Sequence, residues 1–286
     1  MRVFTAIPMA DWRQAGLAAR AAEDVGFDAV MTVELGHDVF TPLALAALAT
    51  QRVELTPSIA VAFPRSPTIT ASNAWDLHAN SNGRFVLGLG SQVKGHNERR
   101  FGIDWTPPAP RLRDYIGALR ALWHCWETRA KLDYHSPHYT LTLMTPAFSP
   151  EPTGLPMVPV TVAAVASASA RVRERIAFYG STRTYLPILA LHGQEELGLK
   201  LHTMSVRGRW QEMAAEISDQ VLHIFAACAP YDGLAAAVAD RFGGAADSID
   251  LNFPADAPVG LQREVLADIR RIPHRFTGFD RNRVVL

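Results

Sequence analysis

Runs of consecutive apolar residues alternate with helically spaced ones along the first half of the chain. The continuous runs predict buried parallel strands at residues 3–7, 28–33, 54–63 and 85–90. Apolar residues three and four positions apart predict helices over residues 12–25, 41–50, 68–78 and 111–126. Asp11 and Gly26 suit the two ends of the first helix, and Thr41 is the expected N-cap of the second. This alternation predicts an α/β fold with a parallel sheet, and a doubly wound sheet and a closed barrel both fit it.

The second half of the chain departs from this alternation. An extended excursion at residues 134–142 and a proline-rich loop at 146–159 precede a fifth strand at 160–165. Only helical patterns follow, over residues 171–179, 197–206, 211–228 and 234–242, before a sixth strand at 247–253 and a helix at 262–271. An eight-stranded barrel needs two more strands than these six.

Composition narrows the class of protein. The chain has 286 residues, of which 48% are hydrophobic, so a sizeable core can form. Lys and Arg equal Asp and Glu at 28 each, and this neutral balance predicts neither a nucleic-acid nor a membrane partner. The two cysteines, Cys125 and Cys228, form no CxxC pair, and the histidines lack metal-ligand spacing, so no metal is expected. No signal peptide or long apolar span is found, which predicts a cytoplasmic protein.

Polar residues crowd the segment after the fourth strand, where parallel α/β folds place their working residues. Gly88 and Gly90 would let the backbone approach a ligand closely. The polar residues that follow are Ser91, Gln92, Lys94, His96 and Asn97. The spacing excludes a Rossmann fingerprint and a P-loop. A ligand-binding loop and a solvated loop with a helix N-cap both remain open.

A second candidate group follows the second strand. His37 could exchange a proton with a substrate, because the pKa of histidine lies near working pH. Glu34 either orients His37 or balances local charge. The alternative for His37 is a surface histidine, or one that caps the helix beginning at Thr41.

Four segments resemble the bacterial luciferase-like superfamily of TIM barrels, whose members use reduced flavin or the deazaflavin coenzyme F420. They are AAEDVGFD at residues 21–28, TPSIAVAFPRSP at 56–67, SNGRFVLGLG at 81–90 and SQVKGHNERRFG at 91–102. The last segment, with WTPPAPR at 105–111, resembles the actinobacterial F420-dependent branch in particular. The resemblance therefore implies a single luciferase-like barrel domain over residues 1–286, of the TIM-barrel (β/α)8 type but incomplete, with about six strands.

The resemblance also implies site residues. In the family the third strand often ends in a non-prolyl cis peptide against the deazaflavin ring, and Ala62–Phe63 is the matching region here. The family's acid/base histidine follows the second strand, where this chain has Leu35 at the strict position and His37 two places later. The implied catalytic residues are His37 and Glu34. The implied cofactor-binding residues are Ala62, Phe63, Gly90, Ser91, Gln92, Asn97 and Val165.

The main departure from the family follows the fifth strand. Two βα units of about 30 residues each are absent between that strand and the helix at 171–179. They help to close the barrel and to hold the cofactor phosphate in the family. An open barrel would expose two strand edges unless a partner subunit or the helical segment at 197–228 covers them.

Three functions fit this sequence. The first is an oxidoreductase that transfers a hydride between coenzyme F420 and a small organic substrate. The second keeps the fold but uses FMN as a luciferase-like monooxygenase. The third is a non-catalytic barrel remnant or a subunit of a heteromer. We expect a homodimer in the first two cases, and the near-zero net charge leaves self-association unopposed.

Overall fold

The computed structural model describes residues 1–162, 172–227, 229–251, 253 and 256–276. Contacts divide the chain into two compact units. The N-terminal unit comprises residues 4–165 and 277–286, and the C-terminal unit comprises residues 1–3 and 166–276. The single barrel domain expected over residues 1–286 stays a prediction.

Parallel strands form the centre of the N-terminal unit. One sheet contains β1 (Arg2–Ala6), β2 (Ala29–Thr32) and β3 (Glu54–Pro57), and another contains β4 (Ala60–Val61), β5 (Leu87–Gly90) and β8 (Val160–Val162). A parallel bridge between Leu55 and Phe85 links the two sheets. Every residue of β2, β3, β4 and β5 is buried, which confirms the predicted parallel strands covered on both faces.

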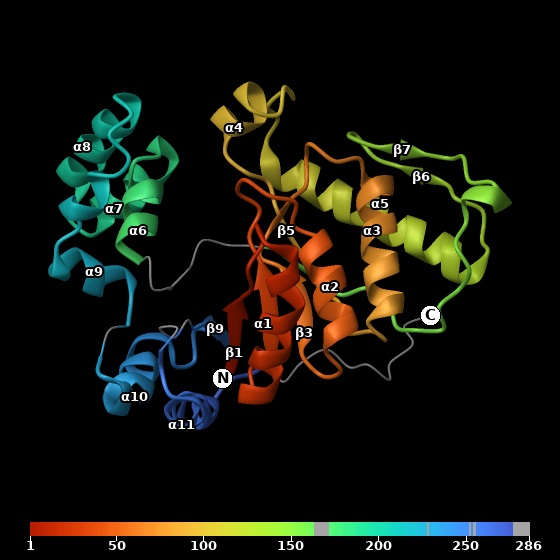
Figure 1. Cartoon of the computed structure of the whole chain (residues 1–286). Helices are drawn as coiled ribbons and strands as arrows, with labels where there is room; N and C mark the ends of the chain where they lie inside the picture. Colours follow the sequence, from red (N-terminus) through yellow and green to blue (C-terminus); the bar gives the residue numbers. More distant parts are fainter. Residues whose placement is uncertain (163–171, 228, 252, 254–255, 277–286) are drawn as a thin grey trace. The chain divides into compact units, whose positions relative to one another are not determined.

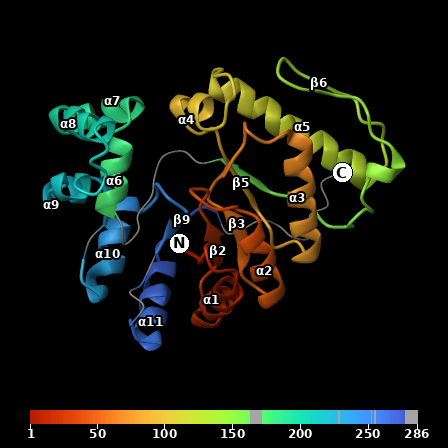
Figure 2. The same cartoon turned by 45° about the horizontal axis from the view of Figure 1, so that its top comes forward.

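The predicted helices follow these strands in the chain. They are α1 (Trp12–Val25), α2 (Thr41–Ala49), α3 (Pro67–Asn80) and α5 (Pro108–Thr128), and each packs against the next one along the unit (Figures 1 and 2). The capping of α1 is confirmed, since Asp11 accepts a hydrogen bond from the Arg13 N–H and Gly26 has a φ of 112°. The apolar pattern therefore predicted the α/β alternation of the first half correctly.

The start of α2 differs from the expectation. Thr41 is the first helical residue rather than the N-cap, which is Phe40. The Asp38 carboxylate accepts hydrogen bonds from the N–H groups of Phe40 and Thr41, at 3.0 and 2.6 Å. A charged acceptor three residues before Thr41 thus satisfies the first N–H groups, so the Thr41 hydroxyl is not needed for this role.

The excursion after α5 is an antiparallel hairpin. Its strands are β6 (Tyr134–His135) and β7 (Thr140–Leu141). The proline-rich loop at residues 146–159 contains one short 3-10 helix, η1 (Pro146–Phe148). A short helix that the apolar pattern did not predict, α4 (Lys94–Arg99), follows β5.

A buried carboxylate ties α1 to the start of β3. Glu23 is 3% exposed and accepts hydrogen bonds from the backbone N–H groups of Gln51, Arg52 and Val53, at 2.6 to 3.1 Å. Burial raises the pKa of Glu23, but these hydrogen bonds outweigh it and hold the pKa below its ordinary value. The carboxylate form is therefore part of the folded structure.

The C-terminal unit is mainly helical. Its helices are α6 (Val172–Gly180), η2 (Arg183–Tyr185), α7 (Leu186–Leu191), α8 (Glu195–Val206), η3 (Met213–Glu216), α9 (Asp219–Phe225), α10 (Tyr231–Phe242) and α11 (Val259–Arg270). A buried apolar cluster around Leu201, Met204 and Met213 holds α6, α8, η3 and α9 together. The helix predicted over residues 211–228 is divided into η3 and α9, because the backbone of Ile217 is extended between them.

One strand also belongs to the C-terminal unit. The strand predicted at residues 247–253 is β9 (Ser248–Asp250). Next to it, the Arg2 N–H donates to the Asp247 carbonyl at 2.9 Å, a hydrogen bond within the C-terminal unit. The amino group of Met1 donates to the Ile272 carbonyl at 2.8 Å and so fixes the chain's first residue beside the end of α11.

Within the N-terminal unit, the pairings among the described residues join β8 to β5 alone, so the barrel is not closed there. This agrees with the predicted incomplete TIM-barrel type. None of the helices in the described ranges is long and apolar enough to cross a membrane.

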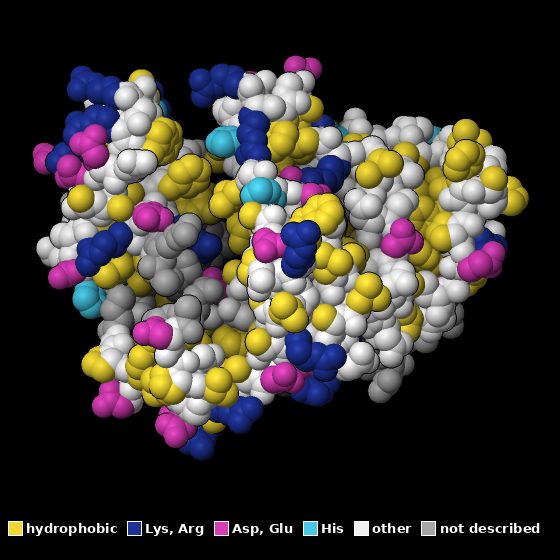
Figure 3. Space-filling model, in the orientation of Figure 1, with side chains coloured by type: hydrophobic (Ala, Val, Ile, Leu, Met, Phe, Trp, Pro, Cys, Tyr) yellow, Lys and Arg dark blue, Asp and Glu magenta, His cyan; other side chains and the backbone are white. Residues whose placement is uncertain are grey.

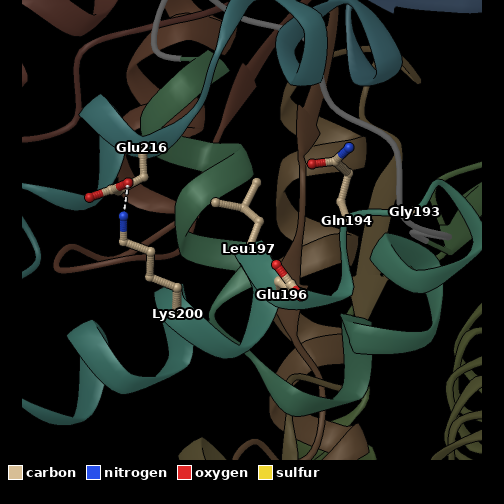
Figure 4. Close-up of a pocket in the computed structure, with 6 residues that line it drawn as sticks. All are labelled: Gly193, Gln194, Glu196, Leu197, Lys200 and Glu216. Atoms are coloured by element: carbon tan, nitrogen blue, oxygen red, sulfur yellow. Dashed lines mark hydrogen bonds and ion pairs between the residues drawn. The ribbon is translucent and has the colours of Figure 1, made fainter.

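A groove lies among α8 and η3 of the C-terminal unit (Figure 4). Its lining residues are Gly193, Gln194, Glu196, Leu197, Lys200 and Glu216. Lys200 and Glu216 form an ion pair, and Leu197 supplies the apolar side chain of the lining. Because sites for aromatic cofactors are mostly apolar, this polar groove does not suit a flavin-type ring.

Candidate functional site

The carboxyl ends of β4 and β5 bring two of the predicted cofactor residues together. Val61 pairs with Gly90 in the sheet, and the Ala62 N–H donates to the Gly90 carbonyl at 2.9 Å. Ala62 and Phe63 are both buried, at 0% and 5% exposure. The loops after β2, β4 and β5 therefore lie at the carboxyl ends of the parallel strands, which is the upper end of the strands in Figure 1.

Glu34 reaches from the loop after β2 to the end of β4. Its Oε2 accepts hydrogen bonds from the buried Val61 N–H at 2.6 Å and from Arg65 Nη1 at 2.7 Å. The same Arg65 Nη1 donates to the Val61 carbonyl at 3.0 Å. The side chain of Glu34 is only 9% exposed, so its charge is balanced by Arg65 inside the protein. These bonds do not involve His37.

His37 lies on the exposed part of the same loop. It makes no side-chain hydrogen bond to any residue in the described ranges. Its neighbour Asp38 caps α2, and although burial raises the Asp38 pKa, the hydrogen bonds from Thr41 and Phe40 lower it below its ordinary value. The catalytic roles assigned to His37 and Glu34 stay predictions.

The two glycines of β5 serve the neighbouring strand. A Cβ at Gly88 would lie 2.0 Å from the Pro57 carbonyl oxygen. A Cβ at Gly90 would lie 2.8 Å from the side chain of Ile59. The lack of a side chain at these glycines therefore lets the segment at residues 57–59 approach β5 closely. Their expected approach to a ligand stays a prediction.

Helix α4 carries the predicted residue Asn97. Asn97 is 1% exposed, and its Nδ2 donates to the Ser91 carbonyl at 3.0 Å. Its Oδ1 is buried and has no hydrogen-bond partner among the described residues. A buried polar atom without a partner costs about 1–3 kcal/mol, so native interiors contain few of them. The free oxygen therefore fits a ligand that donates an N–H or O–H group.

Ser91 and Gln92 form the turn before α4. Gln92 has a φ of 57°, and its side-chain oxygen accepts a hydrogen bond from the Val93 N–H at 3.0 Å. Gln92 thus stabilises its own left-handed turn. Ser91 contributes its carbonyl to Asn97, which fixes the Asn97 amide in place.

His96 is a polar residue of this site that the sequence-based assignment did not include. It is partly buried, and its Nδ1 has no hydrogen-bond partner in the described part of the chain. Burial lowers the pKa of His96, and the positive charges of Arg100 and Arg99 lower it further. Its place in the polar run after β5 was the available signal, but the sequence did not distinguish it from solvated neighbours.

Three arginines lie near the carboxyl ends of these strands. Arg111 lies over the Phe63 ring at 4.5 Å from its centroid, and its Nε donates to the Tyr139 hydroxyl of the hairpin at 3.3 Å. Arg65 lies over the Phe40 ring at 5.5 Å. Arg100 donates to the Leu35 carbonyl and so ties α4 to the loop after β2. Figure 3 shows Lys, Arg and His side chains gathered over α4.

The cis peptide expected at Ala62–Phe63 lies elsewhere. The non-prolyl cis bond among the described residues joins Ser58 and Ile59, in the break between β3 and β4. The resemblance thus predicted the cis peptide in the correct strand segment, but the bond lies four residues earlier than predicted. Val165, the remaining predicted cofactor residue, lies outside the described residues. No cluster of three or more potential metal-ligating side chains occurs within the described ranges.

Comparisons with known proteins agree on one family. The sequence model of the luciferase-like monooxygenases matches residues 3–177. An uncharacterized protein of Mycobacterium tuberculosis is 35% identical over 319 residues, covering 89% of this chain and 94% of that protein. The 5,10-methylenetetrahydromethanopterin reductase of Archaeoglobus fulgidus is 34% identical over 105 residues, covering 36% of this chain and 31% of that protein.

A solved structure supports the fold. The coenzyme F420-dependent tetrahydromethanopterin reductase of Methanopyrus kandleri superposes with a TM-score of 0.69 at 14% identity, over 95% of this chain and 97% of that one. The length of the mycobacterial alignment bears on the missing units. Its 319 residues exceed the roughly 255 residues that make up 89% of this 286-residue chain by about 64. This matches two absent βα units of about 30 residues each.

Proposed function

The chain belongs to the luciferase-like monooxygenase family, and from this premise we propose that it is an oxidoreductase that transfers a hydride between coenzyme F420 and a small organic substrate. The F420-dependent reductase that shares its fold supports the choice of cofactor. The resemblance of residues 91–111 to the F420-dependent branch supports it independently.

The observation that carries this proposal is the unpartnered Oδ1 of Asn97. The pyrimidine part of a deazaflavin ring carries an N–H group, which is the kind of donor that this buried oxygen lacks. Ala62 and Phe63, which are buried just after β4, would form the apolar wall against which the flat ring lies. When bound, the cofactor would supply the hydride chemistry, and these residues would hold and orient it.

The charged residues near the carboxyl ends of the strands would hold the walls of the site in place. Glu34 and Arg65 neutralise each other and hold the end of β4, against which the ring would lie. Arg111 holds Phe63 and the hairpin together. We propose that substrate binds over the exposed face of the ring, between the loops after β2 and β5 and the hairpin.

Cofactor titration tests the proposal. Oxidised F420 and FMN are added separately to the protein, and fluorescence reports binding. We expect F420 to bind with a micromolar Kd and Asn97→Ala to weaken it by about tenfold, as loss of a buried hydrogen bond predicts. Asn80→Ala is the matched control, because Asn80 is exposed and bonds only within α3. Failure of both cofactors to bind would contradict the enzyme assignment.

A second candidate is an FMN-dependent monooxygenase, which the name of the matching family favours. It predicts tight binding of FMN and consumption of oxygen during turnover. The incomplete barrel favours a third candidate, a non-catalytic remnant or heteromer subunit, which predicts that neither cofactor binds. The homodimer stays a prediction in each enzymatic case.

A further inference from the structure

We propose that His96, rather than His37, is the general base of this site and accepts the proton of an alcohol substrate. The inference rests on the proposed F420-dependent function. In the step, His96 takes the proton of the alcohol O–H. The hydride on the same carbon leaves to the oxidised deazaflavin, and the C–O bond becomes a carbonyl double bond. The proton and the two electrons are thereby accounted for.

His96 and Asn97 both lack partners in the protein. Each of these consecutive residues has a buried side-chain atom, Nδ1 and Oδ1 respectively, with no partner among the described residues. Two unsatisfied buried atoms on consecutive residues are unusual in a protein interior, since nearly all buried polar atoms are paired. Groups of a cofactor and a substrate bound at α4 would supply the partners that these atoms lack.

Burial and charge both act on His96. Burial disfavours a positive imidazole, and so do the positive charges of Arg100, the C-cap residue of α4, and Arg99 within it. A neutral imidazole can accept a proton, which is what a general base must do. Arg100 also donates to the Leu35 carbonyl, which holds α4 against the loop after β2.

His37 lacks the fixed position that His96 has. This residue is exposed and has no hydrogen bond in the described ranges that would orient its ring. A base must be held within reach of the proton that it removes. His96 is held by a helix whose N–H groups at His96 and Asn97 both donate to the Val93 carbonyl, at 3.1 Å.

Histidine NMR tests the assignment on the wild-type protein. The ring nitrogens are labelled with ¹⁵N, His96→Gln and His37→Gln identify the two sets of signals, and oxidised F420 is added. We expect the His96 signals to shift on binding while those of His37 stay in place. The reverse pattern would overturn the inference but leave the proposed function standing. If F420 does not bind at all, the proposed function fails and the inference falls with it.

Kinetics supply a second readout. A panel of small primary and secondary alcohols is offered with oxidised F420, whose absorbance reports reduction. We expect His96→Gln to lower kcat by about 100-fold or more, as loss of a general base does, and to change the Kd for F420 by less than about threefold. His37→Gln should keep the wild-type kcat. An enzyme that binds F420 but oxidises none of the alcohols, or a His96→Gln variant with wild-type kcat, would refute the base assignment.

Discussion

Glu34, in the loop after β2, and Arg65, in the loop after β4, form an ion pair of 2.7 Å. β3 pairs with β2 as far as Pro57, and β4, which begins at Ala60, pairs with β5. The Glu34 carboxylate accepts the Val61 N–H and so bonds to β4 from the loop after β2. A side chain singled out for chemistry is thus also part of the sheet.

Removing this carboxylate should destabilise the fold. Glu34→Ala leaves the buried Val61 N–H without an acceptor and Arg65 without its counter-ion. We expect the free energy of unfolding to fall by about 1–3 kcal/mol, measured by urea denaturation. Glu98→Ala is the control, because its pair with Lys94 is 3.7 Å long and solvent-exposed and should contribute less than about 1 kcal/mol. Equal losses in both variants would refute this role of Glu34.

Gly88 should tolerate no side chain. The Cβ of Gly88→Ala would lie 2.0 Å from the Pro57 oxygen, a backbone atom of the adjacent strand that cannot move aside alone. We expect a loss of about 3 kcal/mol or more, at the upper end of overpacking effects, seen as a lower Tm or insoluble protein. Gly36→Ala is the control, since no atom lies within 4 Å of the added Cβ. A Gly88→Ala variant with wild-type Tm would show that the two strands can separate.

The spacing of apolar residues predicted the helices that bury one apolar face. The helices α1, α3 and α5 show an apolar face and buried residues at helical spacing, so their existence followed from the sequence. α4 was missed because its six residues, KGHNER, have no apolar face and are ordered by the turn at Gln92 instead. The break at Ser58 is equally invisible, because an apolar run reads the same whether the strand is straight or interrupted.

The sequence predicted where the candidate site lies, but not the contacts between its residues. The rule that parallel strands carry function at their carboxyl ends located the loops that hold Glu34, Phe63 and Asn97. It did not reveal that Glu34 bonds to Val61, because those two residues lie 27 positions apart in the chain and meet only in the folded structure. Nor did it separate His96 from its polar neighbours, since burial and unpaired atoms arise only from packing.

Glu23 should make stability depend on pH. Its pKa is lowered in the folded protein, so its contribution is present above the unfolded pKa, near 4.5, and is lost as the pH falls through the lower folded value. Glu23→Gln removes the charge that three backbone N–H groups favour. We expect it to lower the unfolding free energy by about 1–3 kcal/mol at pH 7.

Thermal melting at a series of pH values measures this effect. The difference in Tm between wild type and Glu23→Gln should be largest at neutral pH and should shrink as the pH falls from the unfolded value near 4.5 toward the lowered pKa of folded Glu23, where the wild-type carboxylate becomes protonated. Asp76→Asn provides an acidic-to-amide control, because Asp76 is exposed on α3. A Tm difference that is constant from pH 7 to pH 3 would show that Glu23 does not act through its charge.

The hairpin should be held to α5 by a histidine–aspartate pair. His138 Nδ1 lies 2.7 Å from Asp114 Oδ2, and this hydrogen bond is the main cause that lowers the pKa of Asp114. The pairing is therefore present at neutral pH and lost as the pH falls through that lowered pKa. Asp114→Asn should loosen the hairpin. The Tyr139 N–H, which donates to Ser136 Oγ at 3.0 Å, should then exchange with solvent at least about threefold faster.

Asp133→Asn is the matched control for the hairpin, because Asp133 and His135 form a pair that is 63% exposed on both sides. Unchanged hydrogen exchange in Asp114→Asn would mean that the Tyr134 hydroxyl, which donates to the Asp114 carbonyl, holds the hairpin by itself.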